Sequence, residues 1–426
     1  MIEQIYQKFL QSTGICTDTR NISDGNLFIA LKGPNFNANK FAGQALDRGA
    51  TCIVIDDPEY SVPGKTILVE DGLTTLQDLA KTHRARLDIP IIGITGSNGK
   101  TTTKELMHAV LGTTYETFAT RGNLNNHIGV PLSLLSITDK HEIAIIEMGA
   151  NHIGEIAFLS SISRPTHGLI TNIGKAHTGL FGGFEGVIRA KSELYDFLIK
   201  NNGIVFINQD QDILMNMSKR IEAPVFYPGE GAFYRCTFTG AYPFVELTSE
   251  DGIQIKTNLI GAYNFDNIAT ALCVGKFFRV PSEKAYAAIA NYNPVNNRSQ
   301  ILKQGSNTII LDAYNANPSS MEKALENLAL MKSPNKVAIV GDMFELGEDT
   351  AIEHTRVGEK IKELNIEQAL FCGASMELAY RAFGGGNYTP TKEKLIDFLK
   401  DNKFSDSTIL IKASRGMALE DVVEYL

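Results

Sequence analysis

Short apolar runs separated by helix-length segments dominate the chain and predict an α/β protein. Near the N-terminus, strand-like runs at 27–31 and 51–55 are divided by Gly-Pro and Asp-Gly breakers. From Pro90 onward the spacing lengthens, and the apolar runs fall at 91–94, 143–146, 168–171 and 204–207. Strands that alternate with helical segments in this way are typical of parallel βαβ units.

Two further changes of pattern divide the chain. Residues 234–259 alternate as in a hairpin around the turn at 250–252, so we expect the sheet to gain antiparallel strands there, before helices at 264–278 and 282–290. Residues 291–297 are rich in Asn and contain Pro, a composition that suits a linker. Beyond it, apolar runs again alternate with helical segments, at 308–312, 336–340, 369–371 and 408–412.

The pattern therefore predicts three α/β domains. A small N-terminal domain spans 1–87, a central domain with a mostly parallel sheet spans 88–295, and a Rossmann-like domain spans 296–426. With 426 residues, of which 43% are hydrophobic, the chain exceeds the roughly 250 to 300 residues that one hydrophobic core supports. The charged fraction of 21% argues against long disordered stretches.

Charge and cysteine content limit the partners and the compartment. The formal net charge of -8 provides no overall positive field for nucleic acid or a lipid surface, so an anionic ligand must be bound by a few well-placed cations. The five cysteines are scattered, without the close pairs of a zinc or redox motif. No export signal and no membrane-spanning apolar run is evident. We expect a cytoplasmic protein, most simply a monomer.

Candidate chemistry begins directly after the strand predicted at 91–94. The next segment contains Gly96-Ser97-Asn98-Gly99-Lys100-Thr101-Thr102 and leads into a helical run. Strand, glycine-rich loop and helix follow in the order of a P-loop, whose backbone N–H groups hold phosphates. We predict that these seven residues bind nucleotide phosphates, that Lys100 neutralises the β and γ phosphates and that Thr101 binds Mg²⁺. The alternative interpretation is a glycine-rich turn with a solvated lysine.

The loop departs from the general P-loop pattern at one glycine. The pattern has glycine at the position of Ile94, whereas this chain has its glycine one residue earlier, at Gly93. With that early glycine, the loop resembles the phosphate loop of the Mur ligases and of their folylpolyglutamate synthetase relatives. Further blocks follow in the family's order: 147–149, 172–177, 190–193, 261–264 with Asn267, Arg298, 312–321, 341–347 and 412–417.

The resemblance implies an ATP-dependent ligase of bacterial cell-wall synthesis that joins a carboxylate to an amine through an acyl phosphate. Blocks 312–320 and 341–347 resemble the members that add D-alanyl-D-alanine to UDP-N-acetylmuramoyl-tripeptide, giving the pentapeptide precursor of peptidoglycan. The Asp-Asn-Pro-Arg signature of the members that add the third residue does not occur in the sequence. Segments 17–20 and 25–33 resemble the family's uridine-nucleotide-binding domain, although Asn37 and Asn39 stand where Asp and His are common.

The resemblance also implies roles for single residues. Lys191 would be carbamylated and, with Thr101, Glu147 and His177, would support Mg²⁺. Asn267 would bind adenine, and Arg298 and Asp312 would reach ATP from the third domain when the domains close. The residues predicted to act in catalysis are Lys100, Lys191, His177 and Arg298. The residues predicted to bind substrate are Thr19, Arg20, Asn126, Asn315, Asn317, Ser414 and Arg415.

Several of these residues have ordinary structural explanations. Glu147 ends a predicted strand and could be a loop carboxylate, although the carboxyl end of a βαβ strand favours function. His177, Lys191 and Arg415 could simply be solvated, and Asn267 could help to cap a helix.

Two other functions stay open at this level. One is a paralogous ligase, either the enzyme that adds the third amino acid or a folylpolyglutamate synthetase. The other is a P-loop regulatory or transport ATPase. A ligase should release little ADP until both co-substrates are present, whereas such an ATPase needs neither.

Overall fold

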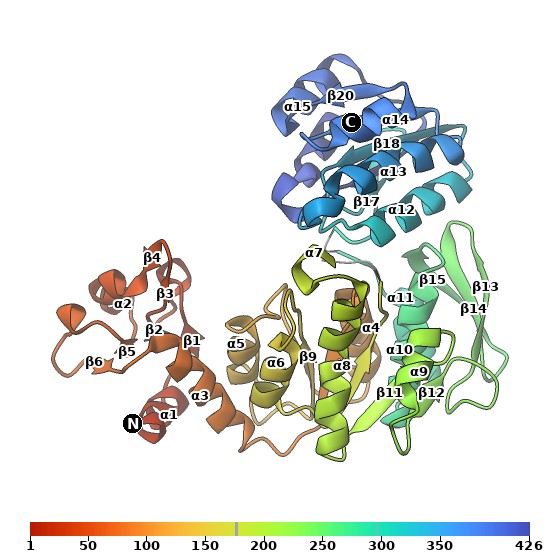
Figure 1. Ribbon diagram of the computed structural model, residues 1–426. Coiled ribbons are helices and arrows are strands. Elements are labelled where there is room, and N and C mark those ends of the chain that lie inside the picture. Colours follow the sequence, from red (N-terminus) through yellow and green to blue (C-terminus); the bar gives the residue numbers. More distant parts are fainter. Residues whose placement is uncertain (175–177, 296) are drawn as a thin grey trace.

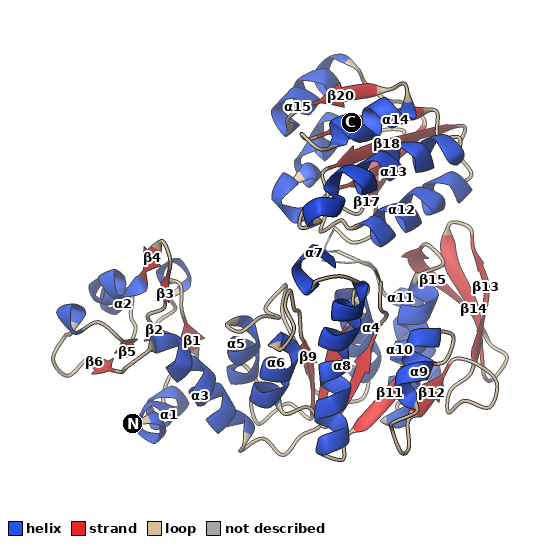
Figure 2. Cartoon of the chain, in the orientation of Figure 1, coloured by secondary structure: helices blue, strands red, loops and turns tan. Residues whose placement is uncertain are grey.

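The computed structural model describes residues 1–174, 178–295 and 297–426, and these ranges form three α/β units in an L-shaped arrangement (Figure 1). The N-terminal unit lies beside the central one, and the C-terminal unit lies above it. Helices flank the sheets of all three units (Figure 2). This confirms the predicted three-domain α/β class, while the boundaries at 87/88 and 295/296 stay predictions. In the described ranges, no helix has the length and apolar character needed to cross a membrane.

The N-terminal unit is built on a parallel sheet with strand order β1-β2-β5-β6. Its strands are β1 (Ile15–Cys16), β2 (Leu27–Ile29), β5 (Cys52–Ile55) and β6 (Thr66–Leu68), with a hairpin of β3 (Lys32–Gly33) and β4 (Phe36–Asn37). Its helices are α1 (Ile2–Leu10), α2 (Ala42–Asp47) and α3 (Gly72–Arg84). Every side chain of β2 and β5 is buried, as expected for parallel strands covered on both faces.

Helix α3 joins the N-terminal unit to the central one. It begins at an N-cap in which the Asp71 carboxylate accepts the backbone N–H of Thr74 at 2.6 Å. Along its length, Gln77 Nε2 donates to the carbonyl of His127 at 3.1 Å, and Arg84 Nε donates to the carbonyl of Ser163 at 2.9 Å. The apolar residues of α1 and α3 belong to the same core cluster as those of α5 (Gly129–Leu135), α6 (Glu155–Ser163) and α8 (Phe184–Lys200) in the central unit.

The central unit contains a six-stranded parallel sheet with strand order β12-β11-β10-β7-β9-β8. Its strands are β7 (Ile91–Thr95), β8 (Thr117–Ala119), β9 (Ile143–Glu147), β10 (His167–Ile170), β11 (Ile204–Asn208) and β12 (Val225–Tyr227). The helices in this part of the chain are α4 (Lys100–Leu111), α5 (Gly129–Leu135), α6 (Glu155–Ser163), α7 (Thr178–Phe181), α8 (Phe184–Lys200), α9 (Asp212–Ser218), α10 (Asn264–Phe277) and α11 (Ser282–Asn291). Because parallel strands end at one edge of a sheet, the segments that follow β7, β9 and β10 come together there.

The hairpin expected at 234–259 forms, but it does not extend the parallel sheet. Strands β13 (Cys236–Ala241), β14 (Phe244–Ser249) and β15 (Gln254–Ile260) make a separate antiparallel sheet. Buried side chains alternate with partly buried ones along β14 and mostly with exposed ones along β15, because one face of the sheet packs on α10 and α11. The expectation that the central sheet gains these strands is therefore wrong.

The C-terminal unit has the strand order β16-β17-β21-β18-β19-β20, parallel except for β16. Its strands are β16 (Gln300–Gln304), β17 (Asn307–Leu311), β18 (Asn335–Gly341), β19 (Gln368–Cys372), β20 (Asn387–Thr389) and β21 (Ser407–Lys412). Its helices are α12 (Pro318–Leu330), α13 (Thr350–Glu363), α14 (Met376–Phe383) and α15 (Lys392–Asp401). Since Leu311 pairs with Ile411, the residues that follow, Asp312 and Lys412, lie side by side.

The ring of His167, at the start of β10, predicts an acid-sensitive step in stability. The ring lies 6.4 Å from that of Phe206 and 5.5 Å from that of Phe277, and burial lowers the pKa of His167 to about 4. An unfolded histidine has a pKa of about 6.5. Between these values only the unfolded chain binds the proton, so the free energy of unfolding falls as pH drops from about 6.5 to about 4, by at most about 3 kcal/mol.

We expect His167→Phe to reduce this loss, because phenylalanine fills the aromatic cluster without titrating. The measurement is the urea midpoint of each protein at pH 7 and pH 4.5. His108→Gln, at an exposed position, is the control and should keep the wild-type difference between the two midpoints. The same difference in His167→Phe as in the wild type would contradict the assignment.

Candidate functional site

A cavity of about 470 Å³ lies where the carboxyl ends of the central strands face the C-terminal unit. Side chains from both units line it. The lining includes these predicted residues: Gly96, Ser97, Asn98, Gly99, Lys100, Thr101, Thr102, Asn126, Glu147, Lys191, Asn267, Arg298, Asp312, Asn315 and Asn317. Residues more than 200 positions apart in the sequence thus meet around one space.

The glycine-rich loop runs from the end of β7 to the start of α4. Gly96 and Gly99 have φ values of +146° and +80°. A Cβ atom would lie 2.0 Å from Thr171 Oγ1 if added to Gly96, and 2.6 Å from Asn267 Oδ1 if added to Gly99. Both positions therefore require glycine. The loop places the N-terminus of α4, where backbone N–H groups attract anions, at the wall of the cavity.

The segment after β10 supports this loop from behind. Thr171 Oγ1 donates to the carbonyl of Asn98 at 2.6 Å, and Asn172 Oδ1 accepts the backbone N–H of Asn98 at 3.0 Å. The backbone N–H of Gly174 donates to Ser97 Oγ at 3.0 Å. The start of the 172–177 block therefore holds the loop in shape.

Lys100 is folded back along the loop. Its Nζ donates to the carbonyl of Gly96 at 2.7 Å and to that of Ser97 at 3.3 Å. Desolvation lowers the pKa of Lys100, the Arg298 charge lowers it further, and Glu147 opposes the shift. A phosphate would relieve this repulsion between cations, so the electrostatics favour an anionic ligand.

Thr101 and Glu147 form a buried pair of oxygen ligands. Thr101 Oγ1 donates to Glu147 Oε2 at 3.0 Å, and Glu147 is only 1% exposed. Asn125 Nδ2 donates to the other carboxylate oxygen at 2.8 Å, and Lys104 Nζ lies 3.7 Å from Oε2. Mg²⁺ is commonly held by one or two protein oxygens together with substrate phosphates. This pair at the end of the loop fits that ion.

The predicted metal ligand His177 lies outside the described residues. Among the residues that are described, no group of three or more His, Cys, Asp or Glu side chains could hold a metal by itself. A metal here therefore needs oxygens from the substrate, or the modification that the sequence predicts at Lys191.

Lys191, on α8, is 3% exposed. Its Nζ lies 5.4 Å from the centre of the Phe181 ring, and within the described ranges no hydrogen bond or ion pair holds its ammonium. Burial lowers the pKa of Lys191 to about 7, with a smaller contribution from the Lys100 charge. With this pKa, a large fraction of the amine is neutral near pH 7. The burial of the side chain excludes the interpretation of Lys191 as an ordinary solvated lysine.

The C-terminal unit supplies Arg298 and Asp312. The Arg298 guanidinium lies 3.7 Å from the centre of the Tyr314 ring, and its buried Nε has no hydrogen-bond partner in the described chain. Asp312 accepts Lys412 Nζ at 2.5 Å and the backbone N–H of Ser299 at 3.1 Å. Arg298 thus has an unpaired donor beside the cavity, whereas Asp312 is already engaged.

Asn267 and Asn126 both line the cavity while making hydrogen bonds of their own. Asn267 Oδ1 accepts the hydroxyl of Thr103 at 2.9 Å, and Asn267 Nδ2 donates to Asn264 at 2.8 Å. Asn126 Oδ1 accepts the backbone N–H of Gly129 at 2.8 Å near the start of α5. Both have structural roles in addition to the predicted ones.

Four predicted substrate residues do not line the cavity. Thr19 and Arg20 lie in the N-terminal unit, where the 85% exposed side chain of Arg20 pairs with Asp18 at 2.7 Å. Ser414 is buried and accepts the backbone N–H of Phe344 at 2.9 Å. Arg415 is exposed and pairs with Glu420. Contacts between these residues and a substrate stay predictions.

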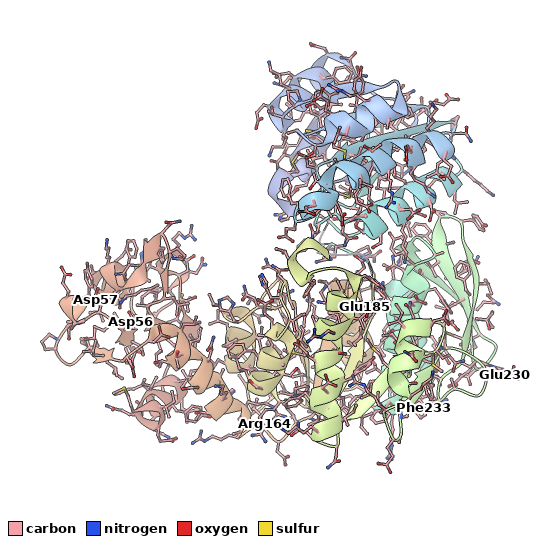
Figure 3. All side chains as sticks on the ribbon, in the orientation of Figure 1. Asp56, Asp57, Arg164, Glu185, Glu230 and Phe233 are labelled. Carbon is pink, nitrogen blue, oxygen red and sulfur yellow. The ribbon has the colours of Figure 1, made fainter. Side chains whose placement is uncertain are left out.

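Asn37 and Asn39, where the chain departs from the family's pattern, form a hydrogen-bond network within the N-terminal unit. Asn39 is buried and donates to Asp56 Oδ1 at 2.7 Å, while Asn37 Oδ1 accepts the Asn39 backbone N–H at 3.0 Å. Asp56, labelled in Figure 3, also accepts the backbone N–H of Gly72 at the start of α3. These asparagines therefore brace the unit.

The sequence patterns do not point to Lys104 or Asn125, which both contact the Glu147 carboxylate. Lys104 could have been found, because it follows Thr101 by three residues and so shares its face of α4. Asn125 lies in the asparagine-rich segment before α5 and has no comparable local signal.

A second cavity lies at the opposite end of the central unit, around Arg164, which Figure 3 labels. Its other arginine, Arg84, donates to the carbonyls of Ser163, Leu87 and Arg164 at 2.8 to 3.0 Å. These hydrogen bonds give the Arg84 guanidinium a structural role, so this cavity is a weaker candidate for a functional site than the first one.

Comparison with protein-family models finds two Mur ligase domains in the central and C-terminal parts of the chain. The family model described as Mur ligase middle domain matches residues 94–275, and the model described as Mur ligase, glutamate ligase domain matches residues 297–415.

Individual relatives extend the match to nearly the whole chain. A Bacillus subtilis (strain 168) protein named UDP-N-acetylmuramoyl-tripeptide–D-alanyl-D-alanine ligase is 35% identical over 434 residues, covering 97% of this chain and 93% of that protein. A crystal structure of MurF from Acinetobacter baumannii has a TM-score of 0.87 at 28% identity, covering 100% of this chain and 98% of that one. The MurF ligase from Thermotoga maritima in complex with ADP has a TM-score of 0.84 at 27% identity, covering 98% and 97%.

Proposed function

The chain belongs to the Mur ligase family, and from this premise we propose that it adds D-alanyl-D-alanine to UDP-N-acetylmuramoyl-tripeptide. The reaction consumes ATP, releases ADP and phosphate, and yields the pentapeptide precursor of peptidoglycan. One observation carries the proposal: a phosphate loop, a buried Thr101–Glu147 oxygen pair and cations from two units line one cavity.

The chemistry requires activation of a carboxylate, which does not react with an amine at neutral pH. A carboxylate oxygen of the tripeptide attacks the γ phosphorus, and ADP leaves with the electrons of the broken bond. The D-alanyl-D-alanine amine then attacks the acyl carbon, loses a proton and displaces phosphate. Positioning and charge neutralisation dominate phosphoryl transfer, which suits the loop N–H groups and Lys100. Mg²⁺ bound by Thr101 and Glu147 would neutralise further phosphate charge.

Lys191 is proposed to carry a carbamate. Its neutral amine nitrogen would bond to the carbon of CO2 and release one proton, which turns a neutral group into an anion; starting from the ammonium, two protons are released. Burial of the amine without an anionic partner in the described chain supports this change, because an ammonium there would be buried and unpaired, whereas a carbamate anion would be paired with Mg²⁺. The carbamate would add hard oxygen ligands for Mg²⁺, and His177 is proposed to add a nitrogen ligand.

The remaining site residues are proposed to bind either the nucleotide or the substrates. Asn267 is proposed to contact adenine, while Arg298 and Asp312 contact the phosphates and ribose from the C-terminal unit. Closure of that unit would exclude the water that hydrolyses an acyl phosphate. Thr19 and Arg20 are proposed to bind the uridine nucleotide. The residues proposed to bind the peptides are Asn126, Asn315, Asn317, Ser414 and Arg415. Location in the cytoplasm and a monomeric state stay predictions.

ADP release tests this function when each substrate is omitted in turn. We expect ADP only when UDP-N-acetylmuramoyl-tripeptide and D-alanyl-D-alanine are both present, because the acyl phosphate needs an acceptor for turnover. ADP release that is independent of both substrates would instead indicate a P-loop ATPase. A panel of alternative amines and acyl substrates, including those of the third-residue ligase and of folylpolyglutamate synthetase, separates the paralogous ligases.

A further inference from the structure

Asn98, in the phosphate loop, makes side-chain contacts to the C-terminal unit. Its Oδ1 accepts Asn317 Nδ2 at 2.8 Å, and its Nδ2 donates to Ser319 Oγ at 2.9 Å. Ser319 Oγ in turn donates to Asn317 Oδ1 at 3.0 Å. The three side chains therefore form a closed ring of hydrogen bonds across the two units, and we call this ring the latch.

The backbone of Asn98 is fixed on the other side of the latch. Its N–H donates to Asn172 Oδ1, and its carbonyl accepts the Thr171 hydroxyl and Asn172 Nδ2. Asn98 therefore has its main chain tied to the loop after β10 and its side chain tied to α12. Asn98 thus contacts both units, beside other contacts such as that between the Tyr263 hydroxyl and Ser299 Oγ at 2.7 Å.

The partners of Asn98 on α12 are also held rigidly. Asn317 is the N-cap of this helix, and its Oδ1 accepts the backbone N–H of Ser320 at 2.9 Å. The hydroxyl of Ser320 accepts the backbone N–H of Asn317 at 3.0 Å, which completes a capping box. Pro318 at the first helical position restricts the backbone further. The latch thus joins two preorganised elements and places the start of α12 against the phosphate loop.

We propose that Asn98 is a positioning residue whose side chain docks the C-terminal unit on the phosphate loop and so brings Arg298 and Asp312 to the cavity. This inference rests on the proposed function, because it assigns the docking to the ligase cycle. Both polar atoms of the Asn98 side chain are engaged by α12, so nucleotide phosphates are left to the loop N–H groups and Lys100. The side chain acts on catalysis through the C-terminal unit.

Three variants test the latch: Asn98→Ala, Ser319→Ala and the double variant. Two hydrogen bonds of ordinary strength across the interface predict a fall in kcat of about tenfold to a hundredfold for Asn98→Ala. The dissociation constant of ADP should rise by a smaller factor than kcat falls, because the loop N–H groups and Lys100 are kept while only the contacts of Arg298 and Asp312 are weakened. Ser319→Ala removes one of these two bonds and should lower kcat by about threefold to tenfold. The double variant should be no worse than Asn98→Ala, because Asn98→Ala already removes both bonds.

Small-angle scattering measures the docking without any turnover. Asn98→Ala should have a larger radius of gyration than the wild type at saturating ADP. Thr391→Ala, which removes the N-cap of α15 in the same unit, is the control and should match the wild type in kcat and radius.

Separate outcomes would overturn the latch and the proposed function. Additive losses in the double variant, an ADP affinity that falls as far as kcat, or an unchanged radius in Asn98→Ala would each overturn the latch. If the wild type fails to ligate the two proposed substrates, the proposed function fails, and the scattering comparison still decides the latch.

Discussion

Replacement of Lys191 by alanine is expected to abolish nearly all ligation. The amine is 3% exposed, and its pKa is lowered to about 7, mainly by burial. It lies in the cavity that also holds Lys100, Thr101 and Glu147. An ammonium would repel Mg²⁺ there, whereas a carbamate would supply negative oxygen ligands. The measurement is the rate of pentapeptide formation with both substrates and Mg²⁺ saturating.

Chemical rescue separates the carbamate from other roles of Lys191. A small carboxylate such as acetate should partly restore Lys191→Ala, because it can occupy the vacated space and replace the lost negative charge. Lys191→Arg keeps the positive charge but cannot form the carbamate, so it should be inactive and resist rescue. Activity near the wild-type level in both variants would eliminate the carbamate proposal.

Replacement of Lys100 by alanine is expected to lower turnover by on the order of 10² to 10³, the scale for one preorganised electrostatic contact at developing charge. The lysine is held along the loop by the carbonyls of Gly96 and Ser97, at the wall where the phosphates are proposed to bind. Steady-state kcat and kcat/KM for ATP measure the effect.

A matched control separates this local effect from a general loss of charge. Lys284→Ala removes an exposed lysine from α11 and should leave turnover unchanged. Lys100→Ala should unfold at a temperature close to that of the wild type, because desolvation already disfavours the Lys100 charge in the folded chain. Turnover near the wild-type level would show that the loop does not bind phosphates as proposed.

Features that depend on neighbouring residues were predictable from sequence. Apolar runs at strand length, separated by helical segments, predict the parallel sheets, because burial on both faces requires continuous apolar strands. Gly96 and Gly99 are recognisable because the turn between β7 and α4 needs positive φ. The hairpin turn was predicted, yet whether β13 to β15 join the central sheet depends on packing against α10 and α11, which no local pattern specifies.

Features that depend on distant residues were decided only by the tertiary structure. Ser414 lies in the 412–417 block that resembles the Mur ligases, but its hydroxyl is buried against the backbone of Phe344. The lowered pKa of Lys191 arises from desolvation, a property of everything packed around α8. Sequence spacing gives no estimate of either, because burial is set by segments that meet after folding.

The contact between Asn98 and Asn317 depends both on local sequence and on tertiary structure. By itself, the sequence predicted a phosphate loop around Asn98, and the family resemblance implied that Asn317 binds substrate. Only the tertiary structure brought together these two side chains, 219 residues apart, at 2.8 Å. Backbone preferences act over a few residues and are written in the local sequence, whereas a hydrogen bond between domains depends on how two complete folds dock.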